Sequence, residues 1–189
     1  MNTEEPWLLS SESCCFTGHR ILPQEVNESV QLYQNLRNII ERLVKEDGIV
    51  NFYAGGALGF DTMAATAVLQ MKEKYPQIKL ILALPFAGQA EDWSLSDQLR
   101  YEDIKEKADR IKMISQEFTD DCMKKRNYYM VDHSCACIYY LLNSPRSGTL
   151  QTVQYARKSG LRMIDLSSEE ITEDYYGYPV WKEQFYTEE

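Results

Sequence analysis

Short apolar runs alternate with longer helix-like segments along most of the chain, and this alternation limits the folds that it can adopt. The predicted strands are residues 13–17, 49–53, 78–84, 110–115, 136–142 and 161–166. Segments of ten or more residues lie between them, and in residues 23–47 the apolar side chains recur every three or four positions, as in an amphipathic helix. Strands that alternate with helices are joined by right-handed crossovers. The pattern therefore predicts an α/β protein with three α/β/α layers and a mainly parallel sheet.

The chain is 189 residues long, which suits one domain with a substantial core. We expect residues 1–166 to form this domain and residues 167–189 to form an acidic, aromatic tail. The tail holds seven acidic residues and one lysine, and so carries −6 of the formal charge of −9. Its aromatic residues predict that it packs on the body or on a partner subunit, as in a homodimer. An acidic chain lacks the basic stripe of a nucleic-acid surface, which disfavours a nucleic-acid partner.

The composition also disfavours a membrane span, an exported protein and a metal centre. No apolar run is long enough to cross a bilayer, and residues 1–11 lack the basic start and apolar middle of a signal peptide. The five cysteines show no C-x-x-C spacing, and four of them fall in apolar, strand-like runs. We therefore expect a reduced, cytoplasmic protein with no membrane contact and no bound metal.

A glycine-rich turn, residues 54–61, joins the second predicted strand to the helix that follows it. Its glycines are Gly55, Gly56 and Gly59. Glycine adopts positive φ and leaves backbone N–H groups open to a ligand, and a helix N-terminus attracts anions. The turn is therefore a candidate phosphate site. The alternative is a tight strand-to-helix connection that binds nothing.

The loops after the predicted strands contain most of the unusual glycine and polar content of the chain. These loops are residues 17–20, 54–61, 85–89, 115–121 and 143–149. In an open parallel sheet, ligands bind at the carboxyl ends of the strands, near the point where the strand order reverses. Because all five loops would open on one edge of the sheet, we expect a shared ligand site there.

The first of these loops is Thr17-Gly18-His19-Arg20, which offers a hydroxyl, a glycine and two donor side chains. Arg20 suits a bidentate phosphate contact, and His19 could donate a hydrogen bond or transfer a proton near neutral pH. The alternative is a turn whose His and Arg face solvent. At the end of the glycine-rich turn, Asp61 could accept a ribose hydroxyl or act as a general base. Alternatively, it only stabilises the first turn of its helix.

Five further candidates lie near the later strand ends. Phe86, Gln89 and Trp93 could sandwich a base and read its edge, although aromatic residues at such positions also pack helices. Arg126 and Asn127 lie on a predicted helix. Whether they reach the strand ends or form a solvated face depends on the rotation of that helix, which the sequence leaves open.

The last candidate loop leads into the helix predicted over residues 149–159. Ser147, Gly148 and Thr149 follow Arg146 and offer two hydroxyls and a glycine at a helix N-terminus, which favours anion binding. Ser147 or Thr149 could instead be only a helix cap. Two anion sites on one edge would suit a ligand with two ends, such as a nucleotide.

With these segments placed, residues 14–166 resemble the YpsA-like family of the SLOG superfamily, which also includes the lonely-guy hydrolases and part of DNA-processing protein A. The matching motifs are Cys15-Phe16-Thr17-Gly18-His19-Arg20, Gly55-Gly56-Ala57-Leu58-Gly59-Phe60-Asp61, Leu84-Pro85-Phe86 with Gln89 and Trp93, Arg126-Asn127 with residues 130–132, and Ser147-Gly148-Thr149. The resemblance implies a doubly wound, Rossmann-like fold. It also implies a nucleotide or nucleotide-derived ligand (a nucleoside phosphate, NAD or ADP-ribose) and, from Bacillus-type members, a role linked to division or stress.

One departure from the superfamily bears on catalysis. In the hydrolase branch, a glutamate assists cleavage at the position where this chain has Thr152. Its absence favours a binding protein, a sensor or carrier, over an enzyme, and we assign no catalytic residue. Two alternatives remain open. One is a hydrolase of N-glycoside or phosphoester bonds that uses Asp61 or His19, and the other is a DNA-binding protein.

Overall fold

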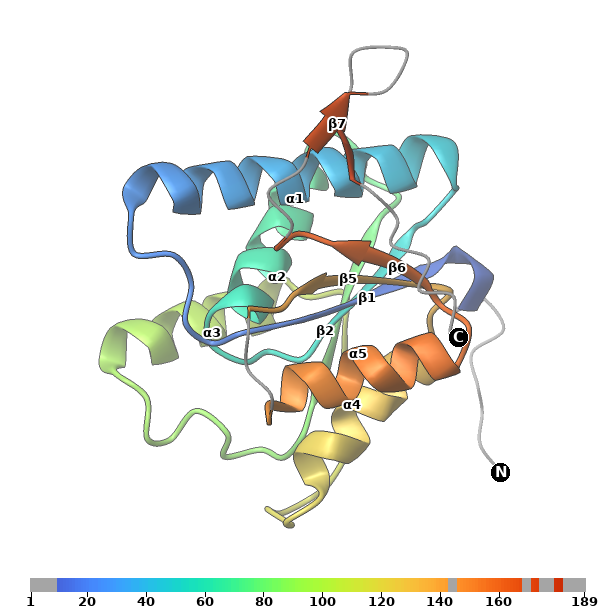
Figure 1. Cartoon of the computed structure of the whole chain (residues 1–189). Helices are drawn as coiled ribbons and strands as arrows, with labels where there is room; N and C mark the ends of the chain where they lie inside the picture. Colours follow the sequence, from blue (N-terminus) through green and yellow to red (C-terminus); the bar gives the residue numbers. More distant parts are fainter. Residues whose placement is uncertain (1–9, 143–145, 168–170, 174–178, 182–189) are drawn as a thin grey trace.

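The sheet at the centre of the molecule has six strands, and all neighbouring strands in it are parallel (Figure 1). The computed structural model describes residues 10–142, 146–167, 171–173 and 179–181. The strands of this sheet are β1 (Ser13–Gly18), β2 (Asn51–Ala54), β3 (Lys79–Leu84), β4 (Arg110–Met113), β5 (Ala136–Tyr140) and β6 (Arg162–Asp165). Their order in space is β4-β3-β2-β1-β5-β6, so the strand order reverses between β1 and β5. The predicted parallel, doubly wound sheet is confirmed.

Helices cover both faces of the sheet (Figure 1). In the described part of the chain they are α1 (Val26–Glu46), α2 (Phe60–Met71), α3 (Leu95–Lys107), α4 (Cys122–Asp132) and α5 (Gly148–Lys158). The first three pack on one face of the sheet, and α4 and α5 pack on the other. This is the three-layer, Rossmann-like architecture that the sequence predicts.

The central strands are buried on both faces, which explains why their sequences are almost continuously apolar. Phe16 of β1 belongs to the core under α1 and α2 and stacks on Phe52 of β2, with 5.9 Å between the ring centroids. The neighbouring residue, Cys15, belongs to the core under α4 and α5, together with Tyr53 and Cys137. Successive side chains of a strand point to opposite faces, so each of these strands contributes to both cores.

The structure differs from the predicted elements at the edges. A short 3-10 helix, η1 (Ser10–Glu12), precedes β1, and β7 (Ile171–Glu173) pairs with β8 (Pro179–Trp181) in a separate antiparallel ribbon. The edge strand β4 ends at Met113, earlier than the predicted 110–115. Three of its four residues are exposed, because an edge strand has a partner on one side only.

The predicted docking of residues 167–189 concerns positions that lie mostly outside the described residues. The division of the chain at residue 166 therefore stays a prediction. Within the described ranges, each helix is too short or too polar to cross a lipid bilayer.

The reversal of strand order brings three chain segments together at one end of β1. The backbone N–H of His19, just after β1, donates to the carbonyl of Tyr140 at the end of β5 (3.2 Å). The carbonyl of His19 in turn accepts from the N–H of Phe60, the first residue of α2 (3.0 Å). These two bonds fix the loops after β1, β2 and β5 relative to one another.

Candidate functional site

A cavity of about 680 Å³ lies at this reversal point, between the end of β1, the start of α5 and one face of α4. Ten of the predicted site residues line it: Thr17, Gly18, His19, Arg20, Asp61, Arg126, Asn127, Ser147, Gly148 and Thr149. Ligands of open parallel sheets bind at such a point, outside the carboxyl ends of the strands. We refer to this space as the first cavity.

The end of β1 forms one wall of the first cavity. The hydroxyl of Thr149, in the first turn of α5, donates to the carbonyl of Gly18 (3.0 Å) and so attaches the helix start to the strand end. The ring Nε2 of His19 lies 3.2 Å from the carbonyl oxygen of Leu142. Because a carbonyl can only accept, Nε2 carries the proton of that bond. The Nδ1 of a neutral His19 ring is then an acceptor.

The glycine-rich turn lies behind the cavity, and its glycines contact other groups of the protein. A Cβ on Gly55 would collide with the guanidinium of Arg126, and the carbonyl of Gly55 accepts from Arg126 Nη1. Gly56 (φ 64°) accepts from Gln89, and Gly59 (φ 76°) packs on the backbone of Arg20. These glycines shape the cavity from behind, while Ala57 and Asp61 are the residues of this region that line it.

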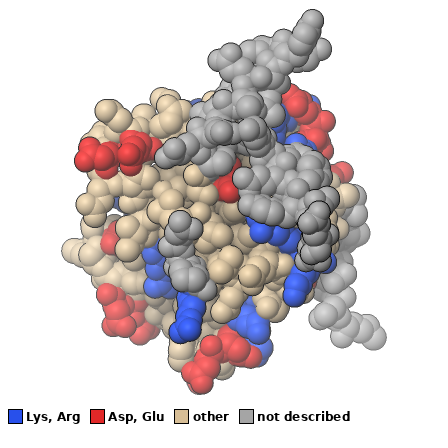
Figure 2. Space-filling model, viewed as in Figure 1, with Lys and Arg blue, Asp and Glu red and all other residues tan. Residues whose placement is uncertain are grey.

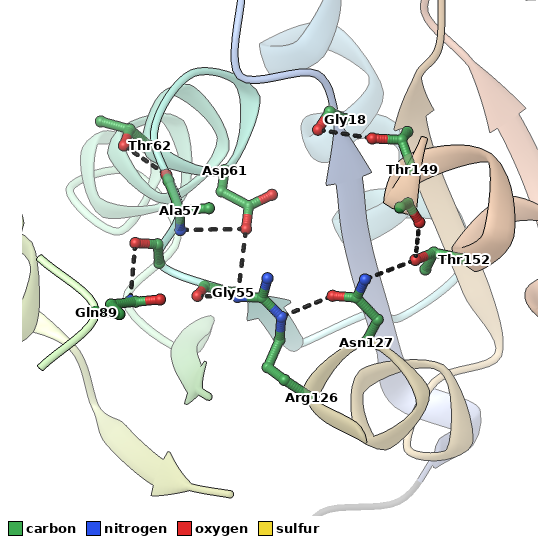
Figure 3. A network of polar contacts seen from close by, with 12 residues as sticks. Gly18, Gly55, Ala57, Asp61, Thr62, Gln89, Arg126, Asn127, Thr149 and Thr152 are labelled. Atoms are coloured by element: carbon green, nitrogen blue, oxygen red, sulfur yellow. Dashed lines mark hydrogen bonds and ion pairs between the residues drawn. The ribbon is translucent and has the colours of Figure 1, made fainter. Parts of the chain in front are cut away.

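An ion pair between Asp61 of α2 and Arg126 of α4 forms the base of the cavity (Figure 3). Nη1 of Arg126 lies 3.9 Å from Oδ2 of Asp61, and the two side chains are only 7% and 8% exposed. Oδ2 also accepts from the backbone N–H of Ala57 (3.3 Å). Burial raises the pKa of Asp61 and lowers the pKa of Arg126, and in each case the charge of the partner opposes the shift.

A chain of hydrogen bonds continues from this ion pair to the start of α5 (Figure 3). Nε of Arg126 donates to Oδ1 of Asn127 (2.7 Å), and Nδ2 of Asn127 donates to the hydroxyl of Thr152 (2.8 Å). That hydroxyl donates to the carbonyl of Gly148 (2.7 Å). Ser147 caps the helix, since its hydroxyl accepts from the N–H of Leu150 (3.1 Å). At the position of the hydrolase glutamate, this chain therefore has a buried structural hydroxyl.

Three predicted residues lie away from the first cavity. The ring of Phe86 packs edge-on against Phe118, with 5.4 Å between centroids, and Trp93 packs edge-on against Tyr101 at 5.3 Å. Gln89 donates both to the carbonyl of Gly56 and to the hydroxyl of Tyr101, each at 3.1 Å. These contacts match the packing alternative, and a role of the three residues in base recognition stays a prediction.

The apolar lining of the first cavity was not predicted from the sequence. Met123 and Met130 line it from α4, and Ile21, Leu22, Pro23 and Leu142 line it from the loops. The helical periodicity could have indicated that the two methionines lie on the same face of the helix as Arg126 and Asn127. Positions 123, 126, 127 and 130 share one face of a helix, because they are spaced by three, four and seven residues. Two apolar and two polar side chains on that face enter the same cavity.

A model of the YspA SLOG family matches residues 14–169 of the chain, which include all of the six-stranded sheet except its first residue, and all of the residues that line the first cavity. The chain belongs to this SLOG family. Membership of the family indicates a function related to nucleotides.

The relatives of this SLOG protein include bacterial and prophage proteins. It is 35% identical over 144 residues to the uncharacterized SPbeta prophage-derived protein YoqJ of Bacillus subtilis, covering 70% of this chain and 84% of that one. It is 32% identical over 103 residues to a UPF0398 protein of Listeria monocytogenes, covering 52% of this chain and 56% of that one. The match thus spans little more than half of the Listeria protein.

Solved structures of DNA processing protein A share the fold of this SLOG protein. The protein from Streptococcus pneumoniae superposes with a TM-score of 0.58 at 18% identity, over 84% of this chain and 51% of that chain. The protein from Helicobacter pylori also gives a TM-score of 0.58, at 16% identity, over 82% of this chain and 65% of that chain. This likeness concerns the fold, and this chain spans about half to two thirds of those proteins.

The expectation that an acidic chain disfavours a nucleic-acid partner is wrong. The Helicobacter pylori protein shares this fold and is described with a single-stranded DNA binding mode. Net charge fails as a criterion because it averages over the whole chain, and residues 167–189 alone carry −6 of the −9. On the face drawn in Figure 2, Lys and Arg side chains gather over the region of α4 and α5. A local basic surface can exist on an acidic protein.

Proposed function

We propose that this SLOG protein binds a nucleotide or nucleotide-derived ligand in the first cavity and acts as a sensor or carrier. The observation that carries the proposal is the convergence of Arg20, His19 and the first turn of α5 on one cavity at the reversal of strand order. Its volume of about 680 Å³ lies within the range of small-molecule sites. Nucleoside phosphates, NAD and ADP-ribose are the ligand classes that we expect.

The phosphate would bind between Arg20 and the start of α5. The first N–H groups of a helix have no partner inside the helix, and its dipole favours an anion there. Arg126 is already paired with Asp61, so its charge is largely compensated. Arg20 has no ion pair in the described part of the chain and supplies the uncompensated positive charge. Its guanidinium suits bidentate phosphate binding.

The sugar and base would lie deeper in the cavity. Asp61 lines the cavity and carries a carboxylate, which repels phosphate but accepts a hydrogen bond from a sugar hydroxyl. The thioethers of Met123 and Met130 and the loop residues Leu22 and Leu142 provide an apolar surface for a base. The mixture of an anion site, a hydroxyl acceptor and an apolar wall fits the three parts of a nucleotide.

Gly148 offers a sharp test, because it lines the cavity and a Cβ there would meet no atom within 4 Å. Gly148→Asp places a carboxylate beside the expected phosphate and also suits the first turn of a helix, so the fold should be retained. Gly148→Asn is the matched neutral control. The affinities are measured by calorimetry with a panel of nucleoside phosphates, NAD, ADP-ribose and single-stranded DNA. We expect a ligand whose affinity falls by about tenfold or more in Gly148→Asp and much less in Gly148→Asn.

Two results would contradict this proposal. One is the absence of any ligand in the panel. The other is a ligand whose affinity is the same in wild type, Gly148→Asp and Gly148→Asn, because such a ligand would bind elsewhere on the protein. If the protein binds single-stranded DNA and Gly148→Asp leaves that affinity unchanged, DNA binding, as named for the Helicobacter pylori protein, would be favoured over a small-molecule function.

Hydrolysis of an N-glycoside or phosphoester bond is the second candidate function. It is favoured by the position of Asp61, a buried carboxyl that lines the cavity and whose pKa burial raises, as is common for groups that transfer protons. Release of base or phosphate from the same panel, abolished by Asp61→Asn, would support it. Binding without turnover would leave the sensor or carrier function.

A further inference from the structure

A second cavity, of about 520 Å³, lies next to the first one and is formed by α1, α2 and α3. The two cavities are separated by the segment that follows β1. The N–H of Phe60 donates to the carbonyl of His19 (3.0 Å), and Gly59 packs directly on the backbone of Arg20. These contacts hold the backbone of the segment against the start of α2, and the side chains of Arg20 and Leu22 line both cavities.

The second cavity carries local positive charge in an acidic protein. Its charged lining residues are Arg20, Arg100 and Asp97, which gives a formal charge of +1. No hydrogen bond or ion pair joins either guanidinium to another residue in the part of the chain that the structure describes. The carboxylate of Asp97 instead accepts from the hydroxyl of Ser94 at the start of α3 (2.7 Å). Two guanidinium groups are therefore available to an anion.

The other polar groups of the second cavity are mostly engaged within the protein. The hydroxyls of Tyr33, Thr62 and Thr66 donate to Gln70, to the carbonyl of Ala57 and to the carbonyl of Thr62. The remaining lining includes the polar Ser29 and the apolar side chains of Leu58 and Met63. Among the described residues, the charged donors that line this cavity are thus the two arginines, and Leu58 and Met63 supply apolar surface.

We propose that the second cavity is a separate binding site for an organic phosphate monoester. Arg20 and Arg100 bind the phosphate, and Leu58 and Met63 contact the organic part of the ligand. A guanidinium pair suits the two oxygens of a phosphate, and the apolar wall distinguishes an organic phosphate from the inorganic ion. This site is distinct from the proposed nucleotide site, but the two sites share Arg20, whose side chain lines both cavities.

Methionine methyl groups allow the two cavities to be observed separately. Met63 lines the second cavity, whereas Met123 and Met130 line the first. In protein labelled with ¹³C at the methionine methyls, AMP as the probe should shift the Met63 signal and saturate it. By the same signal, adenosine and inorganic phosphate should each bind at least about tenfold more weakly than AMP. Adenosine lacks the phosphate that the arginines would bind, and inorganic phosphate lacks the organic part that the apolar side chains would contact. The signals are assigned with the corresponding Met→Leu variants.

Arg100→Gln should raise the dissociation constant read from the Met63 signal by about tenfold and leave the Met123 and Met130 signals as in wild type. Lys107→Gln is the matched control, since Lys107 lies on the same helix, pairs with Asp103 (2.7 Å) and does not line the cavity. Arg100 makes no hydrogen bond or ion pair with the residues that the structure describes, so its substitution should keep the fold. An unmoved Met63 signal at about 10 mM AMP, equal binding of phosphate alone, or equal affinity in Arg100→Gln would each overturn the proposal.

Discussion

Asp61 and Arg126 face each other at the base of the first cavity, where Oδ2 and Nη1 are 3.9 Å apart and both side chains are almost fully buried. Each charge would be costly to bury alone, and each compensates the other. The guanidinium also donates to the carbonyl of Gly55, so the pair joins α2, α4 and the glycine-rich turn. The geometry of the cavity therefore depends on this pair.

Replacing Arg126 by glutamine should destabilise the protein by about 3–5 kcal/mol, because it leaves Asp61 buried without a positive partner. Urea unfolding at neutral pH measures this loss. The double variant Asp61→Asn/Arg126→Gln should recover part of the stability, since no unpaired charge remains. If the stability loss of the double variant equals the sum of the losses of Asp61→Asn and Arg126→Gln, the two side chains do not interact directly.

The same variant should have a characteristic pH dependence. Burial raises the pKa of Asp61, and without Arg126 it loses the largest influence that opposes it, so the pKa of the folded state should rise further. A carboxyl whose pKa is raised by folding stabilises the protein most when it is protonated, and that stability is lost as the pH rises through the raised pKa. The deficit of Arg126→Gln should therefore be smaller near pH 4 than near pH 8. Equal deficits at both pH values would argue against a buried, unpaired Asp61.

Gly55→Ala tests the close approach of the guanidinium to the turn. A Cβ at this position would collide with Arg126, so we expect a loss of about 1–3 kcal/mol through overpacking. Gly148→Ala is the matched control, because a Cβ there meets no atom within 4 Å. It should leave the unfolding free energy unchanged or raise it slightly, as alanine favours helix. Similar effects of the two substitutions would show that the space at Gly55 is not limiting.

The strand and helix pattern predicted most of the fold because each element carries a local signal. The predicted strand 136–142 corresponds to β5, residues 136–140, and the helix predicted to carry Arg126 and Asn127 corresponds to α4, residues 122–132. Ribbon β7–β8 was not predicted, since its strands have three residues each and lie in an acidic, aromatic segment. Strands of that length carry too few residues for a periodic pattern.

The site was less predictable, because its central contact joins positions far apart in the chain. The sequence suggested that Asp61 and Arg126 could each reach the ligand site at the strand ends. Nothing in the sequence around either residue indicates that the two side chains pair with each other. The glycines were predicted to leave backbone open to an anion, whereas Gly55 leaves room for the guanidinium of Arg126. Glycine indicates close approach and does not reveal which group approaches.

Glu41 connects α1 to the segment that follows α2, and its contacts should make the stability of the protein depend on pH in the acidic range. Its carboxylate accepts from Lys45 (2.8 Å), Lys74 (2.7 Å) and Tyr75, and these contacts lower the pKa of Glu41 to about 2. A carboxyl whose pKa is lowered by folding stabilises the protein above its unfolded pKa, and that stability is lost as the pH falls. The stabilisation that Glu41 contributes is therefore lost as the pH falls from about 4.5 to about 2.

We expect Glu41→Gln to reduce stability by about 1 kcal/mol at pH 7, a modest value because solvent screens a partly exposed carboxylate. Near pH 2 the difference from wild type should shrink. Urea midpoints at the two pH values measure both effects. Glu102→Gln, which removes an exposed pair with Lys105, is the control and should change little at either pH. A Glu41→Gln deficit that is the same at pH 7 and pH 2 would contradict the assigned contacts.

Arg20→Gln should weaken ligand binding in both cavities, because the Arg20 side chain lines both of them. Arg20 is exposed and has no ion pair in the described residues, so the unfolding free energy should stay within about 0.5 kcal/mol of wild type. In the methionine methyl spectra, affinities read from Met63 and from Met123 should both fall by about tenfold. Arg20→Lys should retain part of the affinity, since lysine keeps the charge but loses the bidentate geometry. A loss of affinity at one cavity alone would contradict the proposed role of Arg20 in the other cavity.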